Sequence, residues 1–120
     1  MTTQADRQPI RIEVARGVTV VHLLASQIHS SFPGHYDAED LKEKLNLLID
    51  RGHVDLVLDM GRVEYTASMF LGVLFLLQRR LVGLGGRLRI CSLQPSIQEL
   101  FGIARIKFEL HPDLPSALAS

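Results

Sequence analysis

The sequence has one cysteine, no tryptophan and no net charge. A single cysteine, Cys91, excludes an intrachain disulfide and a metal site built from several thiolates. Because thirteen basic and thirteen acidic side chains balance, the chain lacks the broad positive surface of a nucleic-acid-binding protein. We therefore expect no nucleic acid and no metal among its ligands. Cys91 stands among apolar residues, which is typical of a small core residue.

Long apolar runs are also missing. The longest, residues 69–77, is too short to cross a bilayer, and the first eight residues are polar. We therefore expect no secretory signal, no direct membrane insertion and a cytoplasmic location. Because 47% of the 120 residues are hydrophobic, the composition is that of a folded chain. We predict a flexible N-terminus at residues 1–8 and a single domain at residues 9–120.

Hydrophobic periodicity predicts strands and helices in alternation from residue 9 onwards. Two strands, over residues 10–15 and 18–24, flank the turn Arg16-Gly17 and form an antiparallel hairpin. The later strands are predicted over residues 54–60, 87–92 and 106–110. The helices are predicted between Asp37 and Gly52, from Ser68 to Val82, from Pro95 to a stop at Gly102, and over residues 114–118.

This order predicts an α/β domain of two layers, with a mixed, mostly parallel sheet of about five strands and about four helices. Residues 26–37 show no period and contain Pro33-Gly34, so we predict a loop there. The helix from Ser68 is apolar on nearly every side. It must therefore bury more surface than its neighbours or expose an apolar patch that marks a partner surface. Residues 74–77 lie in this helix, and a homodimer is one hypothesis.

The motifs of common catalytic and cofactor sites are missing. The five histidines have no metal-binding spacing, and the Gly-x-Ser-x-Gly turn of hydrolases is absent. Gly83, Gly85 and Gly86 follow a helix and precede a strand, whereas a phosphate-binding loop needs the reverse order. We therefore expect no catalytic residue, no cofactor and no enzymatic activity. His22 lies in a strand, where we expect it to be packed or hydrogen-bonded.

Ser68 stands at a strand-to-helix junction, the edge of the sheet where α/β proteins place functional groups. The simpler interpretation is an N-cap serine that accepts a backbone N–H. Alternatively, Ser68 is a phosphoacceptor, because a helix N-terminus favours added negative charge.

Charge is unevenly distributed along the chain. Residues 37–64 contain eight acids and four bases, and residues 78–108 contain six bases and one acid. This asymmetry predicts either a dipolar surface that docks to a charged partner or ordinary solvated faces.

Residues 54–119 resemble the STAS domain, the fold of bacterial anti-sigma factor antagonists. The resemblance is carried by Val54-Asp-Leu-Val-Leu-Asp-Met-Gly-Arg-Val-Glu-Tyr65, by Leu71-Gly-Val-Leu74 and by Leu84-Gly-Gly-Arg-Leu-Arg-Ile90. Residues 95–102 and 114–118 also match in pattern, and the opening hairpin fits more loosely. Residues 26–40 diverge from the family.

In that family an Asp-Ser-Ser/Thr-Gly motif opens the second helix. Its first hydroxyl residue is phosphorylated by a partner anti-sigma kinase, which breaks the complex. The matching residues here are Ala67-Ser68-Met69-Phe70, so that only the first hydroxyl is kept. These replacements favour a docking role over standard phospho-switching. Met69 and Phe70 are either apolar anchors of an interface or plain core residues.

The resemblance implies a regulatory module that binds a kinase-type anti-sigma factor or a related signalling protein, with Ser68 as the candidate phosphoacceptor. The expected partner-binding residues are Arg62, Glu64, Tyr65, Thr66, Ala67, Ser68, Met69 and Phe70. One alternative is a STAS scaffold subunit of a signalling or membrane-transport assembly that is never phosphorylated. Another is a small ligand- or nucleotide-binding domain.

Overall fold

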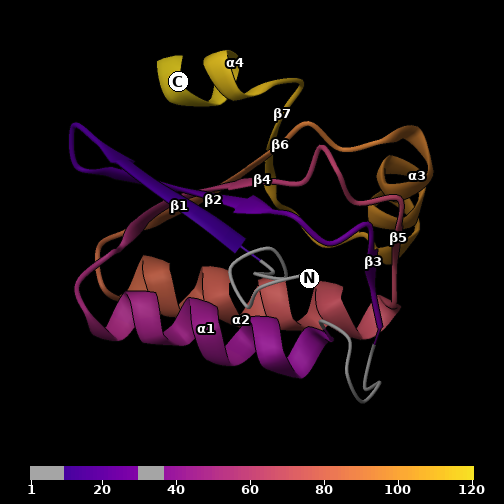
Figure 1. The fold of residues 1–120 in the computed structure, drawn as a ribbon, viewed down its shortest axis with the longest axis horizontal. Helices are drawn as coiled ribbons and strands as arrows, with labels where there is room; N and C mark the ends of the chain where they lie inside the picture. The colour runs from indigo at the N-terminus through magenta and orange to yellow at the C-terminus, as the bar shows by residue number, and fades with distance from the viewer. Residues whose placement is uncertain (1–9, 30–36) are drawn as a thin grey trace, which may run out of the picture.

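The predicted opening hairpin is present and forms one edge of a five-stranded sheet (Figure 1). A computed structural model describes residues 10–29 and 37–120, so the predicted flexible N-terminus at residues 1–8 lies outside the described residues. In sheet order the strands are β1 (Ile10–Ala15), β2 (Val18–Leu23), β4 (Asp55–Asp59), β6 (Arg87–Cys91) and β7 (Glu109–His111). β1 is antiparallel to β2, and the other neighbours are parallel. The predicted mixed sheet is confirmed.

The hairpin turn has the geometry that its two residues favour. Arg16 and Gly17 both have positive φ angles, 55° and 80°. This is the arrangement of a type I′ turn, whose twist matches that of the two flanking strands. Ala15 and Val18 are therefore paired directly across the turn.

The described residues form four helices around the sheet, as the periodicity predicted. They are α1 (Ala38–Asp50), α2 (Ser68–Gly83), α3 (Pro95–Ala104) and α4 (Leu114–Ala119). The Asp37 carboxylate caps α1 by accepting a hydrogen bond from the backbone N of Asp40 at 2.8 Å. Helices α1 and α2 lie side by side on one face, α3 lies near β5, and α4 lies on the opposite face (Figure 1).

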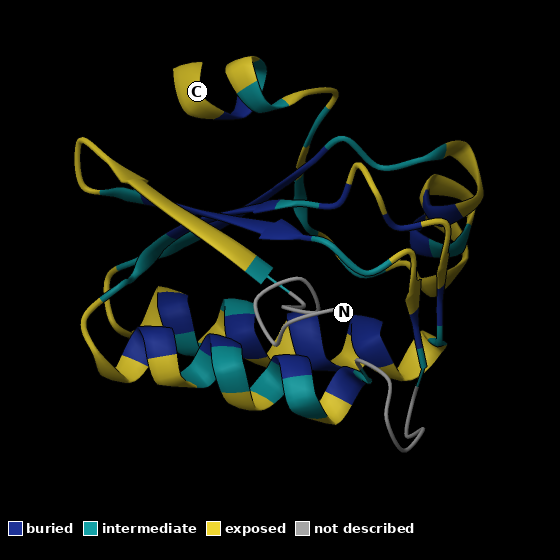
Figure 2. Ribbon diagram, in the orientation of Figure 1, coloured by how far each residue is buried: buried dark blue, intermediate teal, exposed yellow. Residues whose placement is uncertain are grey.

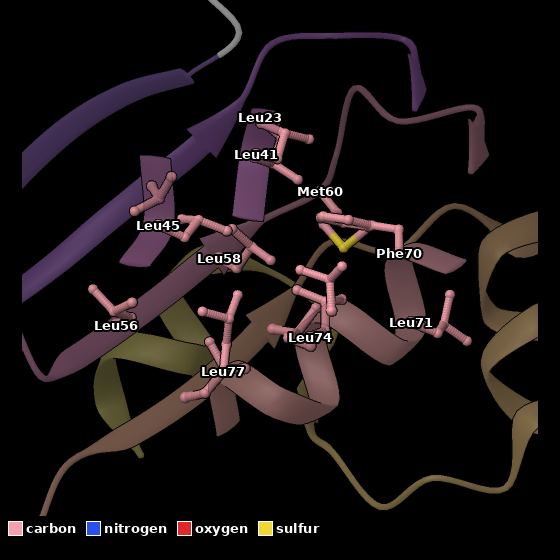
Figure 3. Close-up of a cluster of buried hydrophobic side chains, with 14 of the residues drawn as sticks. Leu23, Leu41, Leu45, Leu56, Leu58, Met60, Phe70, Leu71, Leu74 and Leu77 are labelled. Atoms are coloured by element: carbon pink, nitrogen blue, oxygen red, sulfur yellow. The ribbon is translucent and has the colours of Figure 1, made fainter. Parts of the chain in front are cut away.

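The main core lies between the sheet and the helices α1 and α2. In Figure 2 the sides of these helices that face the sheet are buried, and β1 at the edge is mostly exposed. Leucines from the central strands and from both helices fill this layer, together with Met60 and Phe70 (Figure 3). A smaller cluster on the opposite face contains Val20, Val57, Cys91 and Ala117.

A buried arginine attaches α4 to this second face. Arg89 is 2% exposed, and its guanidinium donates to the carbonyl of Ala117 at 2.7 Å and to the Asp55 carboxylate at 2.6 Å. The short helix therefore contributes one buried side chain and one hydrogen-bonded carbonyl to a face that no other helix of residues 10–29 and 37–120 covers.

Four elements differ from the sequence prediction. Two short strands, β3 (Gln27–Ile28) and β5 (Tyr65–Thr66), form a parallel pair in segments predicted as loops. Helix α3 does not stop at Gly102 but continues to Ala104, because the left-handed residue that ends it is Arg105. The last strand begins at Glu109 rather than at residue 106. Residues 30–36 of the predicted loop lie outside the described residues.

Candidate functional site

The segment before Ser68 is held by the β3–β5 pair that the sequence did not reveal. The backbone N atoms of Glu64 and Ala67 donate to the carbonyls of Ser26 and Ile28, each at 2.7 Å. These two bonds fix both ends of β5 against the segment that follows β2. A two-residue strand has no measurable period, so these partners could only be found in three dimensions.

The start of α3 holds the same segment from another side. The side chain of Gln94 donates to the carbonyl of Gly61 at 3.0 Å, and the hydroxyl of Ser96 donates to the carbonyl of Glu64 at 3.3 Å. The loop between β4 and β5 is therefore bonded to an element that comes thirty residues later in the sequence.

The carboxylate of Asp59 supplies a third anchor at the end of β4. It accepts the backbone N–H of Gly61 at 3.0 Å, and its other oxygen lies 2.7 Å from Nδ1 of His22. His22 is buried in β2. The expectation that His22 is packed and hydrogen-bonded is confirmed.

Ser68 is the first residue of α2 and not its N-cap, so the N-cap prediction is wrong. The N-cap is Ala67, which has no side chain able to accept a hydrogen bond. The Ser68 side chain is exposed. Its hydroxyl makes no hydrogen bond to another described residue. The first turn of α2 contains no acidic residue, so the helix N-terminus offers uncompensated positive potential to an added anion.

The other predicted contact residues divide by exposure. Four of them are exposed, as Ser68 is, and we define the Ser68 surface as the exposed members of the predicted set: Arg62, Glu64, Tyr65, Ser68 and Met69. Ala67 is half-buried.

Thr66 and Phe70, which were also predicted to contact a partner, are buried and therefore lie outside the Ser68 surface. Phe70 is 0% exposed and lies beside Met60 in the core (Figure 3), whereas its neighbour Met69 is 42% exposed. Successive residues point about 100° apart around a helix, so one of the two faces the sheet and the other faces solvent. Of the two candidate apolar anchors, only Met69 is therefore exposed.

Helix α2 also exposes an apolar stripe along its outer side. Phe75, Leu76 and Val82 are exposed on α2, while Leu74 and Leu77 are buried. The sequence predicted that this helix either buries more surface than its neighbours or exposes an apolar patch. The three exposed side chains show that α2 exposes part of its apolar surface. The homodimer stays a prediction.

Ion pairs within the fold neutralise part of the basic charge that the sequence concentrates in residues 78–108. Arg80, Arg87 and Arg89 form ion pairs with Asp50, Glu109 and Asp55. The hydrogen bond from Arg87 lowers the pKa of Glu109 to about 2, with His111 assisting. Half of the six bases in residues 78–108 therefore serve ion pairs within the fold, and the predicted dipolar surface is correspondingly weaker.

The described residues contain no group of three side chains placed to hold a metal ion. Among the same residues, no helix is both long and apolar enough to pass through a membrane. Cys91 is fully buried, as predicted, and burial raises the pKa of its thiol. This thiol is therefore a packing group rather than a nucleophile.

Comparison with known sequences relates the chain to one protein family and to curated proteins. A family model described as "Mlab, STAS domain" matches residues 34–108, which is more than half of the chain. BtrV of Bordetella bronchiseptica, named as a candidate anti-sigma factor antagonist, is 37% identical over 68 residues. That alignment covers 57% of this chain and 59% of BtrV, less than two thirds of either.

Solved structures with the same fold cover nearly the whole chain. An anti-sigma factor antagonist from Mycobacterium paratuberculosis has a TM-score of 0.76 and 21% identity, over 92% of this chain and 90% of that one. The antagonist SpoIIAA in its unphosphorylated form has a TM-score of 0.68 and 17% identity, over 92% and 94%. The murine anion transporter Slc26a9 has a TM-score of 0.71 and 14% identity, over 89% of this chain but 18% of that one. At these identities the likeness shows the fold.

Proposed function

The chain belongs to the STAS domain family, and from this membership we propose that it is a regulatory module of the anti-sigma factor antagonist kind. In this proposal it binds a kinase-type anti-sigma factor through the Ser68 surface and thereby frees a sigma factor. The chain acts as binding partner and phosphorylation substrate in the cytoplasm, and it catalyses no reaction itself.

The observation that carries the proposal is the state of Ser68. Its hydroxyl is exposed, unbonded to other described residues and placed at the N-terminus of a sixteen-residue helix. A kinase needs an accessible hydroxyl oxygen to accept the γ-phosphoryl group of ATP, with ADP leaving and the hydroxyl proton lost. The helix N-terminus stabilises the phosphate that results. Phosphorylation is therefore compatible with the fold.

The same modification opposes binding of the partner. A phosphate adds a charge of about −1.5 to −2 at neutral pH. Tyr65 and Met69 flank Ser68 with exposed apolar surface. A partner that covers these side chains would have to desolvate the new charge, which costs free energy unless a cation pairs with it. Release of the partner is the expected result.

A second candidate function is a STAS scaffold subunit that is never phosphorylated. It is favoured by Phe70, a large core side chain at the position where the resemblance expects a glycine. It is also favoured by the exposed stripe of Phe75, Leu76 and Val82, which continues the apolar surface along α2. In this alternative the docking surface is retained and only the switch is lost.

Docking at the Ser68 surface is tested by two matched variants. Met69→Arg places a charge on that surface, and Leu118→Arg places the same charge on α4, on the opposite face of the sheet. The two side chains are similarly exposed, 42% and 44%, so folding should tolerate both changes equally. Native chain and both variants are used as baits in native lysate, and the captured proteins are quantified by mass spectrometry.

We expect Leu118→Arg to retain the partners of the native chain and Met69→Arg to lose them by about tenfold or more, as for an interface anchor. Recovery of the same partners by Met69→Arg as by Leu118→Arg would place the docking surface elsewhere. Recovery of a protein with an ATP-binding kinase domain supports the antagonist over the scaffold.

A further inference from the structure

A surface cavity of about 750 Å³, open to solvent and lined in part by the exposed residues Arg105, Lys107 and Leu110, lies between the C-terminal half of α3, residues 105–108 and β7. This volume falls within the range of small-molecule sites, about 300–1,000 Å³. Its apolar lining includes Leu93, Phe101, Ile106, Phe108 and Leu110. The rings of Phe101 and Phe108 pack against each other with centroids 5.3 Å apart, which gives the cavity a firm wall.

Two polar side chains of the lining, Gln98 and His111, are bonded to the carbonyl of Leu93 and to Glu109, and the other two are basic. Arg105 and Lys107 line the cavity, and neither side chain forms a hydrogen bond or an ion pair with another described residue. The described lining contains no acidic side chain. The nearest acid along β7, Glu109, is outside the lining and is already paired with Arg87 and His111. Two positive charges are therefore left without a partner at the cavity.

The backbone around the cavity is held in an unusual conformation. Arg105 has a φ of 56° and Ser92, directly before Leu93, has a φ of 66°. Among the described residues only one other non-glycine residue, Arg16, has a positive φ, and it lies in the hairpin turn. Such conformations are uncommon for side-chain-bearing residues, and that of Arg105 ends α3 beside the cavity. Gln78 on α2 fixes this region by donating to the carbonyl of Lys107 at 2.9 Å.

We propose that this cavity binds a small amphipathic anion. The apolar body of the ligand lies against Phe101, Phe108 and Leu110, and its carboxylate or phosphate head lies between Arg105 and Lys107. An apolar lining with unpaired cations and no acidic side chain is complementary to an amphipathic anion. It is not complementary to a neutral lipid, which leaves the cations unpaired, or to a cation, which they repel. The cavity shares no residue with the Ser68 surface, so ligand binding there is tested independently of the proposed function.

Decanoate, decyl phosphate, decanol and inorganic phosphate are the probes. They are titrated below their aggregation concentrations into the isotopically labelled chain, and binding is followed by amide chemical shifts and calorimetry. We expect both amphipathic anions to bind at least about tenfold more tightly than decanol, since a hydrogen bond to a charged group is worth roughly 1.5–3 kcal/mol. Inorganic phosphate alone should bind more weakly than either, because it lacks the apolar body. The largest shifts should fall on residues 101–112.

The charges are tested with a matched pair of double variants. Arg105→Gln with Lys107→Gln removes two cations from the cavity, and Arg16→Gln with Arg51→Gln removes two exposed cations elsewhere. The first should bind decanoate no better than decanol, and the second should bind like the native chain. Leu110→Glu, at an exposed position that lines the cavity, should abolish decanoate binding. Absence of decanoate binding, equal affinity for decanol, or equal loss in both double variants would overturn the proposal.

Discussion

Nδ1 of His22 lies 2.7 Å from Oδ2 of Asp59, and Oδ1 of the same carboxylate accepts the backbone N–H of Gly61. One side chain at the end of β4 therefore bonds to β2 on one side and to the loop before Ser68 on the other. Hydrogen bonds to a charged group are stronger than those between neutral groups. The position of the Ser68 surface thus depends on a residue outside that surface.

Removal of this carboxylate should loosen the loop. We expect Asp59→Ala to lower the free energy of unfolding by about 1–2 kcal/mol and to shift the amide resonances of residues 61–66. Glu13→Ala is the control, because Glu13 is exposed and its carboxylate lies 3.5 Å from the other ring nitrogen of His22. Its effect should stay below about 0.5 kcal/mol. Urea denaturation and an amide spectrum of each variant measure both quantities, and equal effects would remove Asp59 from this role.

The clamp between Arg89 and α4 makes a second prediction. Arg89→Met removes the buried donor to the carbonyl of Ala117, which then keeps only its bonds from Ser120, and it leaves Asp55 without its cation. We therefore expect a loss of about 2–3 kcal/mol of unfolding free energy. Arg11→Met removes an exposed arginine that pairs with Glu13 at 3.5 Å, and it should cost little. Thermal denaturation compares them. A loss no greater for Arg89→Met than for Arg11→Met would show that the clamp adds nothing.

Substitution of alanine for two glycines should change the stability of the fold in opposite directions. A Cβ on Gly86 would lie 2.1 Å from the carbonyl oxygen of Val54, a backbone atom that cannot easily move away. Gly86→Ala should therefore destabilise the fold by about 3 kcal/mol or more. A Cβ on Gly72, within α2, meets nothing within 4 Å, so Gly72→Ala should stabilise by about 0.5–1 kcal/mol. Denaturation midpoints of the two variants on the same side of the native value would contradict the packing described for Gly86.

The Glu109–Arg87 pair predicts a loss of stability in acid. The folded pKa of Glu109, about 2, lies below its ordinary value of 4.5, so the stabilisation is present above pH 4.5 and is lost as the pH falls towards 2. Because 34% of the Glu109 side chain is exposed, solvent screening limits the effect to about 1 kcal/mol. Glu109→Gln and Arg87→Gln should each flatten the fall of unfolding free energy over this range. A native pH slope in Arg87→Gln would mean that Arg87 is not the cause of the shift.

The fold followed from patterns that repeat over at least one strand or helical turn. Alternating apolar and polar residues on either side of Arg16-Gly17 predicted the hairpin. The spacing of apolar residues and the acids near its start predicted α1. The pair β3 and β5 was missed because each strand has only two residues and its partner is distant in the sequence. The end of α3 was misplaced because Arg105, rather than Gly102, adopts the left-handed conformation.

The sequence predicted where the Ser68 surface lies along the chain, but not which side chains are exposed there. A strand-to-helix junction marked Ser68 and its neighbours, and five of the eight predicted residues are exposed there. Sequence alone could not decide which of Met69 and Phe70 faces the core, because both lie in a helix that is apolar on nearly every side. The basic cavity was not foreseen, since the neighbourhood of α3 and β7 depends on where α3 ends.

The central claim, that phosphorylation of Ser68 releases a protein partner, is tested most directly by the dissociation constant of the captured partner for three forms of the chain. These are the native chain, Ser68→Ala and Ser68→Asp, compared in one titration. We expect Ser68→Ala to bind like the native chain and Ser68→Asp to bind at least about tenfold more weakly, a difference of about 1.4 kcal/mol. Equal dissociation constants for Ser68→Ala and Ser68→Asp would contradict the switch and leave a constitutive scaffold.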